Sequence, residues 1–184
     1  MPPDPVPPRT LNAPWRQDYL DAIDQAERTG GPPSTGSFIL DYWLDPASDD
    51  KNHVIVRTAD GLILLNKFPY SGGHLLVALG EARPTLLDYS PAQRARLWSL
   101  TDAAAALMQA ALEPQGINIG VNQGRAAGAG VPQHLHVHLV PRWHGDVNFM
   151  AVVGQVKLIS SSLDAMAARY RQSWARLGRP MPGA

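Results

Sequence analysis

Three histidines on alternate positions are the residues of this chain most suited to chemistry. They are His134, His136 and His138, half of the six histidines in the sequence, and apolar residues separate them. Because successive side chains of a strand point to opposite faces, a strand over residues 134–141 would place the three rings on one face, about 7 Å apart. Such a row of imidazoles predicts either a metal site or a site in which imidazole itself reacts.

A metal site is the first alternative. An open site of three histidines can hold zinc and activate water. The outer two positions of this motif, however, lie roughly 13 Å apart in a strand, too far for all three rings to reach one ion. At most two neighbouring rings could bind it, with a further ligand from elsewhere. The spacing therefore favours imidazole chemistry over a metal hydrolase.

The second alternative uses one neutral imidazole as a nucleophile on phosphorus. Such a ring needs one nitrogen held as a hydrogen-bond donor, so that the other nitrogen keeps its lone pair for attack. A glycine-rich loop over residues 122–130 leads directly into the motif. Backbone N–H groups of a glycine-rich loop can approach a phosphate closely. The order of loop and histidines thus predicts displacement chemistry at a phosphate.

Composition narrows the class of protein. The 184 residues are 45% hydrophobic, which suffices for one domain with a core. The formal net charge is zero, and with 17% charged residues nothing predicts binding to nucleic acid or to a membrane surface. There is no cysteine, and therefore no disulfide and no thiolate. The N-terminus lacks a signal-peptide pattern and no run of about 18 apolar residues occurs, so we expect a cytoplasmic protein.

The elements that must position the histidines follow from local patterns. Alternating apolar residues and turn signals predict five strands, and their order with the helices favours an α+β fold with an antiparallel sheet of about five strands. The predicted strands cover residues 53–58, 62–65, 74–79, 117–121 and 134–141.

Two helices are predicted to pack on this sheet. The first, a long central helix, has Ser90 as N-cap, Pro91 at its first position and Gln93 at the capping-box position. The second, C-terminal helix repeats apolar residues over 163–177, and we expect its aromatic stripe to serve packing.

One domain over residues 11–177 is expected between two irregular ends. Residues 1–10 contain five prolines and are predicted to be a disordered lead. Residues 178–184 are predicted to be a flexible tail. Near the start of the domain, residues 14–29 are predicted to form a short helix and residues 30–37 a loop.

The motif resembles the signature of the histidine triad (HIT) superfamily, His-φ-His-φ-His-φ-φ with φ apolar. Residues 134–140 match it at every position. Residues 65–77 resemble the family's nucleoside-pocket strand and the turn to a fourth histidine. Residues 13–19 and 141–150 resemble segments of the bacterial branch related to diadenosine tetraphosphate phosphorylases and hydrolases. The similarity covers about residues 11–177 and implies the HIT-like fold.

The resemblance implies a role for each histidine of the site. His136 would attack the α-phosphate of a nucleotide and become nucleotidylated. His134 and His74 would hold its orientation and tautomer, and His138 would contact the phosphate and the leaving group. Nucleotide contacts are implied for five further residues, the first near the ribose and the others at the phosphates: Asn66, Asn122, Gly128, Gly130 and Val131.

Two departures from the family's pattern bear on these expectations. Many relatives have a glutamine or hydroxyl residue in the phosphate loop that is missing here. Arg125 or Gln133 could substitute for it, or either could be plain loop surface. Many also carry a Cys-x-x-Cys pair of a structural zinc site where this chain has residues 36–40. We therefore expect no structural zinc and no required cofactor, while Mg²⁺ could accompany the nucleotide.

We therefore hypothesise that the protein is an enzyme, a nucleotidyl hydrolase or transferase. It would cleave adenine dinucleoside polyphosphates such as diadenosine tetraphosphate at the α-phosphate, with water or inorganic phosphate as acceptor. The resemblance also implies a homodimer. The alternatives are a nucleoside phosphoramidase, a nucleotide-binding sensor with little turnover, and a metal hydrolase. The sequence leaves open the acceptor, the preferred base and the length of the polyphosphate.

Overall fold

The computed structural model describes residues 35–146, 159 and 161–178. Three expectations lie outside the described residues: the proline-rich lead, the helix over residues 14–29, and the tail beyond residue 178. The described residues belong to one compact unit, Ser34–Ala184.

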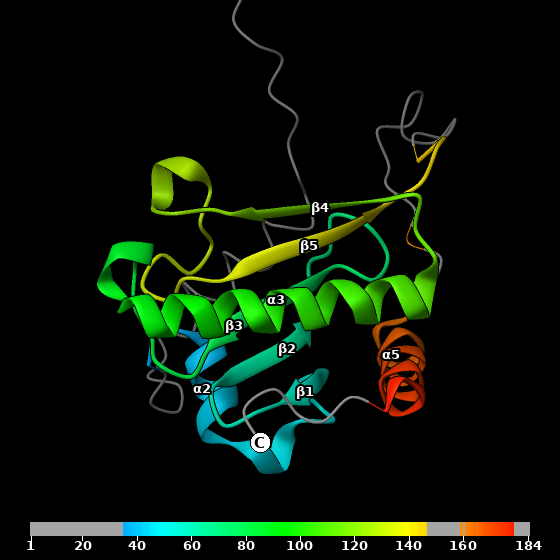
Figure 1. Ribbon diagram of the computed structural model, residues 1–184. Coiled ribbons are helices and arrows are strands. Elements are labelled where there is room, and N and C mark those ends of the chain that lie inside the picture. Colours follow the sequence, from blue (N-terminus) through cyan, green and yellow to red (C-terminus); the bar gives the residue numbers. More distant parts are fainter. Residues whose placement is uncertain (1–34, 147–158, 160, 179–184) are drawn as a thin grey trace, which may run out of the picture. The chain divides into compact units, whose positions relative to one another are not determined.

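A five-stranded sheet forms the centre of this unit, with the strand order β1-β2-β3-β5-β4 (Figure 1). Every neighbouring pair is antiparallel, which confirms the predicted α+β class and the antiparallel sheet. The strands are β1 (Val54–Arg57), β2 (Gly61–Leu65), β3 (Leu75–Leu79), β4 (Gly116–Val121) and β5 (Val137–Arg142).

The helix α3 (Pro91–Leu112) crosses one face of the sheet (Figure 1). Its predicted start is confirmed, because Ser90 Oγ accepts the Gln93 N–H at 3.3 Å and Gln93 Oε1 accepts the Ser90 N–H at 2.9 Å. These reciprocal bonds satisfy backbone donors that have no partner inside the helix. The apolar side of α3 packs on alternate strand residues in the main core, which includes Leu97, Leu100, Ala104, Leu107, Ala111, Leu75, Val77, Leu135, Val137 and Leu139.

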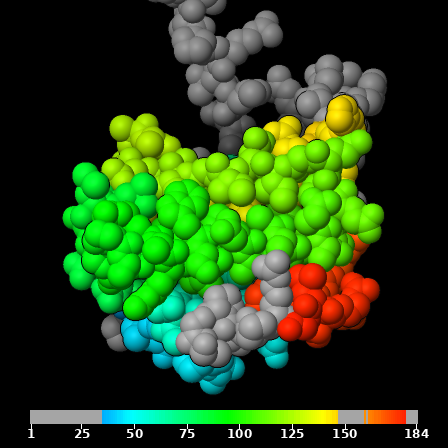
Figure 2. All heavy atoms as spheres, viewed as in Figure 1, coloured from blue at the N-terminus to red at the C-terminus, as the bar shows by residue number. Residues whose placement is uncertain are grey.

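The C-terminal helix α5 (Leu163–Leu177) packs beside α3, and the two adjoin on one face of the molecule (Figure 2). It begins at the N-cap Ser162 and ends at Gly178, whose φ of +56° favours glycine. Tyr170 is fully buried and donates a hydrogen bond to the Gly73 carbonyl at 2.7 Å, so the predicted packing role of the aromatic stripe is confirmed. In the part of the chain that is described, no helix has the length and apolar character to traverse a lipid bilayer.

The short helix α2 (Phe38–Leu44), which the sequence pattern does not predict, lies against the opposite face of the sheet. Its side chains Phe38, Tyr42 and Trp43 pack on a second apolar cluster of strand residues, Val54, Leu62, Leu64 and Leu76. These residues alternate along the strands with members of the main core, so the sheet is covered on both sides.

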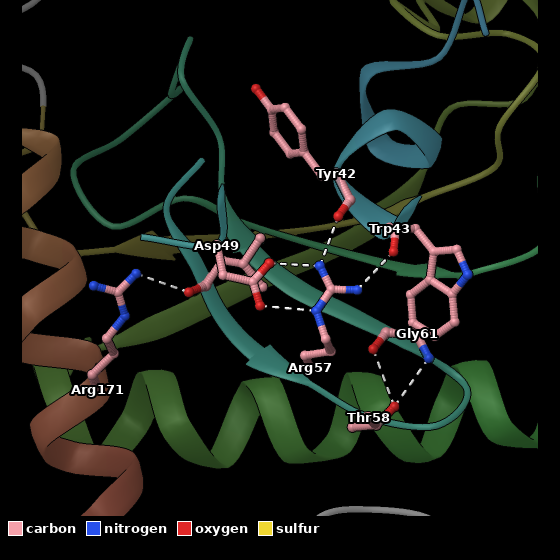
Figure 3. Close-up of polar contacts among 8 residues, drawn as sticks. Tyr42, Trp43, Asp49, Arg57, Thr58, Gly61 and Arg171 are labelled. Carbon is pink, nitrogen blue, oxygen red and sulfur yellow. Dashed lines mark hydrogen bonds and ion pairs between the residues drawn. The ribbon is translucent and has the colours of Figure 1, made fainter. Parts of the chain in front are cut away.

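Arg57 of β1 fastens the C-terminal end of α2 to the sheet (Figure 3). Its guanidinium donates to the carbonyls of Tyr42 and Trp43 at 2.6 and 2.9 Å, and to both carboxylate oxygens of Asp49 at 2.8 and 2.5 Å. The last carbonyls of a helix have no partner within it, and a cation there also complements the helix dipole. The hydrogen bond to Asp49 raises the pKa of Arg57.

The strand β5 begins at Val137, three residues later than predicted, so only the last of the three histidines lies within it. The predicted start at residue 134 is wrong because the preceding backbone bonds to loops. The His134 N–H donates to the Val131 carbonyl at 3.2 Å, and the Leu135 N–H donates to the Arg83 carbonyl at 2.8 Å. The first part of the histidine motif therefore lies outside the sheet and is held by contacts with loops.

Candidate active site

The histidine motif keeps its predicted alternation although the strand is shorter. His138 pairs with Leu76 across β5 and β3, and Leu76 belongs to the cluster under α2. Directly paired residues of an antiparallel sheet share a face. The apolar residues Leu135 and Val137 instead lie in the main core with α3. The reactive side of the motif therefore faces away from α3.

His134 is fully buried and is held at both ring nitrogens. Nε2 lies 2.8 Å from the Leu79 carbonyl, which can only accept, so Nε2 carries the proton. Nδ1 lies 2.9 Å from Ser37 Oγ, and that oxygen accepts the Leu40 N–H at 3.2 Å. Burial lowers the pKa of His134 to about 4, so at neutral pH the uncharged Nδ1 accepts the Ser37 hydroxyl.

The ring of His136 has the protonation that a nucleophilic imidazole needs. Its Nδ1 lies 2.8 Å from the His134 carbonyl oxygen, so Nδ1 donates and carries the proton. Burial lowers the pKa of His136 and keeps the ring neutral near pH 7. In residues 35–146, 159 and 161–178, no group donates a hydrogen bond to its Nε2. The lone pair on Nε2 is thus available for attack.

His74, directly before β3, forms a hydrogen-bonded pair with His138. The Nε2 of His74 lies 3.0 Å from the Nδ1 of His138, and the Tyr70 N–H donates to the Nδ1 of His74 at 3.1 Å. A neutral His74 therefore carries its proton on Nε2 and donates it to His138. A neutral His138 in turn carries its proton on Nε2.

Ring contacts join the histidines to the turn between β2 and β3. The rings of His136 and His138 meet edge to face with centroids 4.8 Å apart, and Tyr70 stacks on His74 at 4.9 Å. Asn66 Nδ2 lies 3.3 Å from the Nδ1 of His74. The structure thus places the predicted ribose residue Asn66 beside the fourth histidine, and its contact with a nucleotide stays a prediction.

The glycine-rich loop after β4 bends at Gly124 and Gly128, whose φ values are +84° and +83°. Glycine is favoured in this left-handed region because it lacks a Cβ. A single turn, Arg125–Ala127, lies between them. A Cβ on Gly128 would stand 3.8 Å from Asn122 Nδ2, so the loop brings these two predicted phosphate residues together.

The end of the loop meets the histidine motif at Val131. This side chain is buried, and its carbonyl accepts the His134 N–H at 3.2 Å, whereas Gly130 is exposed. Of the two candidates to substitute for the missing glutamine or hydroxyl residue, Gln133 donates its amide to the Gly36 carbonyl. Arg125 is exposed, and within the described ranges its side chain makes no ion pair or hydrogen bond.

Two residues of this arrangement, Ser37 and Tyr70, are missed by the sequence analysis. Ser37 lies 97 positions before His134, and its available signal is that of an N-cap serine before an apolar run. Tyr70 falls in the segment that resembles the family's nucleoside-pocket strand, but nothing in its spacing indicates a stack on a histidine.

The described residues do not fit a structural zinc site. They contain no group of three or more histidine, aspartate or glutamate side chains placed to hold a metal ion, and the chain has no cysteine. His134 uses both ring nitrogens in bonds to Ser37 and Leu79. The absence of structural zinc and of a cofactor requirement both stay predictions.

Comparison with known proteins agrees with this geometry. A family model described as the HIT domain matches residues 47–145. The chain is 34% identical over 167 residues to AP-4-A phosphorylase of Mycobacterium tuberculosis, covering 90% of this chain and 84% of that protein. It is 32% identical over 95 residues to the asymmetrical bis(5'-nucleosyl)-tetraphosphatase of Schizosaccharomyces pombe, covering 52% of each. A solved Zn-bound histidine triad family protein from Mycobacterium smegmatis superposes with a TM-score of 0.60 at 25% identity, over 74% of this chain and 93% of that one.

Proposed function

Because this chain belongs to the HIT family, we propose that it is a nucleotidyl hydrolase or transferase that cleaves adenine dinucleoside polyphosphates at the α-phosphate. The observation that carries the proposal is the state of His136, whose Nδ1 is held as a donor 2.8 Å from the His134 carbonyl. That bond leaves the lone pair on Nε2. The names of the relatives from M. tuberculosis and S. pombe support a tetraphosphate substrate.

In the first step, Nε2 of His136 attacks the α-phosphorus, and the bond from that phosphorus to the bridging oxygen breaks. From diadenosine tetraphosphate the products are adenylyl-His136 and ATP, whose terminal oxygen keeps the bonding electrons. His138 donates a hydrogen bond from its Nε2 to the phosphate or to the departing oxygen. Donors placed where negative charge develops stabilise such a transition state.

In the second step, an acceptor oxygen attacks the same phosphorus and the phosphorus–nitrogen bond breaks. The bonding electrons return to Nε2 of His136. Water as acceptor gives AMP and loses its protons to the solvent, whereas inorganic phosphate gives ADP. The identity of the acceptor thus separates a hydrolase, like the S. pombe relative by name, from a phosphorylase, like the M. tuberculosis relative by name.

The nucleotide would be held by two parts of the chain. Asn66 beside His74 would contact the nucleoside. The loop residues Asn122, Gly128, Gly130 and Val131 would contact the phosphates. The close approach of Asn122 to Gly128 supports this arrangement, because it places a side-chain amide at a bend rich in backbone N–H groups.

We also propose a homodimer that forms at the β4 edge of the sheet. The side chains of Ile119 on β4 and Trp98 on α3 are 46% and 44% exposed. An edge strand carries unpaired backbone groups that a second strand can bind. Sedimentation analysis of the purified protein tests this, and a monomer at working concentration would contradict it.

The test of function compares wild type with His136→Ala, and with His144→Ala as a control at an exposed histidine. Each is incubated with diadenosine tetraphosphate, with and without phosphate and EDTA, and the products are separated by chromatography. We expect AMP, or ADP only with phosphate, and a fall in turnover of at least about a thousandfold in His136→Ala. EDTA should not abolish turnover.

Other outcomes would contradict this proposal. Binding of the nucleotide without turnover would favour a sensor, and cleavage of a nucleoside phosphoramidate alone would favour a phosphoramidase. Activity that is retained in a folded His136→Ala protein and lost with EDTA would indicate metal hydrolysis.

A further inference from the structure

Ser37 differs from the other N-cap serines of this protein. The residue is 1% exposed, and its side chain forms hydrogen bonds with two groups, the Leu40 N–H at 3.2 Å and the Nδ1 of His134 at 2.9 Å. The exposed N-cap residues Ser90 and Ser162 accept N–H groups of their own helices at 3.3 and 3.2 Å. Ser37 therefore joins the start of α2 to the histidine motif.

His134 is the residue through which Ser37 can affect the nucleophile. Its ring is fixed at two ends, by the Ser37 hydroxyl at Nδ1 and by the Leu79 carbonyl 2.8 Å from Nε2. The backbone carbonyl of the same residue accepts the Nδ1 proton of His136 at 2.8 Å. The position of that carbonyl decides which nitrogen of His136 carries the proton, because a neutral imidazole has a single proton to place.

A neighbouring contact holds the same two segments together. The Gln133 amide donates to the carbonyl of Gly36, directly before Ser37. Gly36 has a φ of +79°, and a Cβ there would stand 3.1 Å from the Gln133 amide nitrogen. Glycine thus allows the close approach. The backbone on both sides of the Ser37–His134 bond is therefore constrained.

We propose that Ser37 is a positioning residue for the nucleophile. Its hydroxyl fixes the ring and backbone of His134, and thereby holds His136 in the tautomer with the lone pair on Nε2. The link to catalysis rests on the proposed function, in which His136 attacks phosphorus. The tautomer itself is a property of the free protein and can be measured without a substrate.

The experiment uses three variants of the full chain. Ser37→Ala removes the hydroxyl, and Ser37→Thr keeps it as the conservative variant. Ser162→Ala is the matched control, because it removes an N-cap hydroxyl that accepts at the same 3.2 Å and has no hydrogen bond to a histidine. With the histidine ring nitrogens isotope-labelled, long-range nitrogen–proton NMR spectra report which nitrogen of His136 carries the proton.

We expect Ser37→Ala to shift the spectrum of His136 from the Nδ1-protonated form toward a mixture. Its kcat should fall about tenfold, the factor for one hydrogen bond of ordinary strength, with KM changed by less than about twofold. Ser37→Thr should restore both properties, and Ser162→Ala should leave both unchanged.

Two results would overturn the proposal. One is a folded Ser37→Ala protein whose His136 spectrum matches wild type. The other is an equal loss of kcat in Ser37→Ala and Ser162→Ala, which would assign the effect to helix capping. If the wild type lacks turnover, the proposed function fails, while the spectrum of the free protein still decides the role of Ser37.

Discussion

The burial of His134 predicts that the protein loses stability on mild acidification. The residue is 0% exposed, and burial lowers the pKa of its ring to about 4 from an ordinary value of 6.5. Between these values the unfolded chain binds a proton that the folded chain does not. The contribution to the free energy of unfolding is therefore complete above pH 6.5 and is lost as the pH falls toward 4. At about 1.36 kcal/mol per pKa unit, the total is about 3 kcal/mol, of which about 2 kcal/mol is lost by pH 5.

Urea unfolding at about pH 7.5 and pH 5, at equal ionic strength, measures this loss. In His134→Gln the residue cannot titrate, so the drop in unfolding free energy should be about 2 kcal/mol smaller than in wild type. His144→Gln, which changes an exposed histidine, should behave as wild type. Equal drops in wild type and His134→Gln would refute the reasoning. An NMR titration of wild type gives a direct check, since the ring of His134 should stay neutral down to pH 5.

Two further predictions concern the support of the site. Arg57→Lys removes the paired bonds to Asp49 and should lower the free energy of unfolding, measured by urea titration, by about 2 kcal/mol. The control is Arg96→Lys, at an ion pair whose arginine is more exposed. It should change the free energy of unfolding by less than about 0.5 kcal/mol. Tyr70→Phe keeps the ring that stacks on His74 and should leave kcat/KM for diadenosine tetraphosphate within about twofold of wild type. Tyr70→Ala removes the ring and should lower kcat/KM about fivefold. Equal values for the two variants would show that the stack has no role.

The elements with local signals could be predicted from the sequence. The reciprocal Ser90 and Gln93 bonds and the left-handed Gly178 depend on residues a few positions apart, so the ends of α3 and α5 follow from the local pattern. The first three strands are likewise bounded by turn residues within each hairpin.

The helix α2 and the start of β5 lie beyond local reasoning. α2 has seven residues, and its hydrophobic run lacks the helical period because side chains on several sides of it are buried or half-buried. β5 starts late because the Leu135 N–H bonds to Arg83, a residue 52 positions earlier in the chain. A short stretch of sequence around α2 or around the histidine motif does not include the distant residues that each of them contacts.

The type of chemistry at the site could be predicted from the sequence, but the hydrogen-bond partners of the histidine rings could not. Alternate histidines predict rings on one face, and the structure confirms that alternation. The proton on Nδ1 of His136, however, follows from a carbonyl placed by Ser37 and Leu79, which belong to other elements. Spacing along one strand contains no information about such partners.

The separation along the chain of these partners has a consequence for folding kinetics. Three of the side-chain bonds that orient the histidine rings are long-range. They run from His134 to Leu79, from His74 to His138 and from His134 to Ser37, and join residues 55, 64 and 97 positions apart. Contacts between distant residues form late, because closing a long loop costs entropy before the contact stabilises it. During refolding, the reactive tautomer of His136 should therefore appear only after the sheet has assembled. A fragment that ends before β5 lacks the strand between β3 and β4, and we expect it not to hold that tautomer.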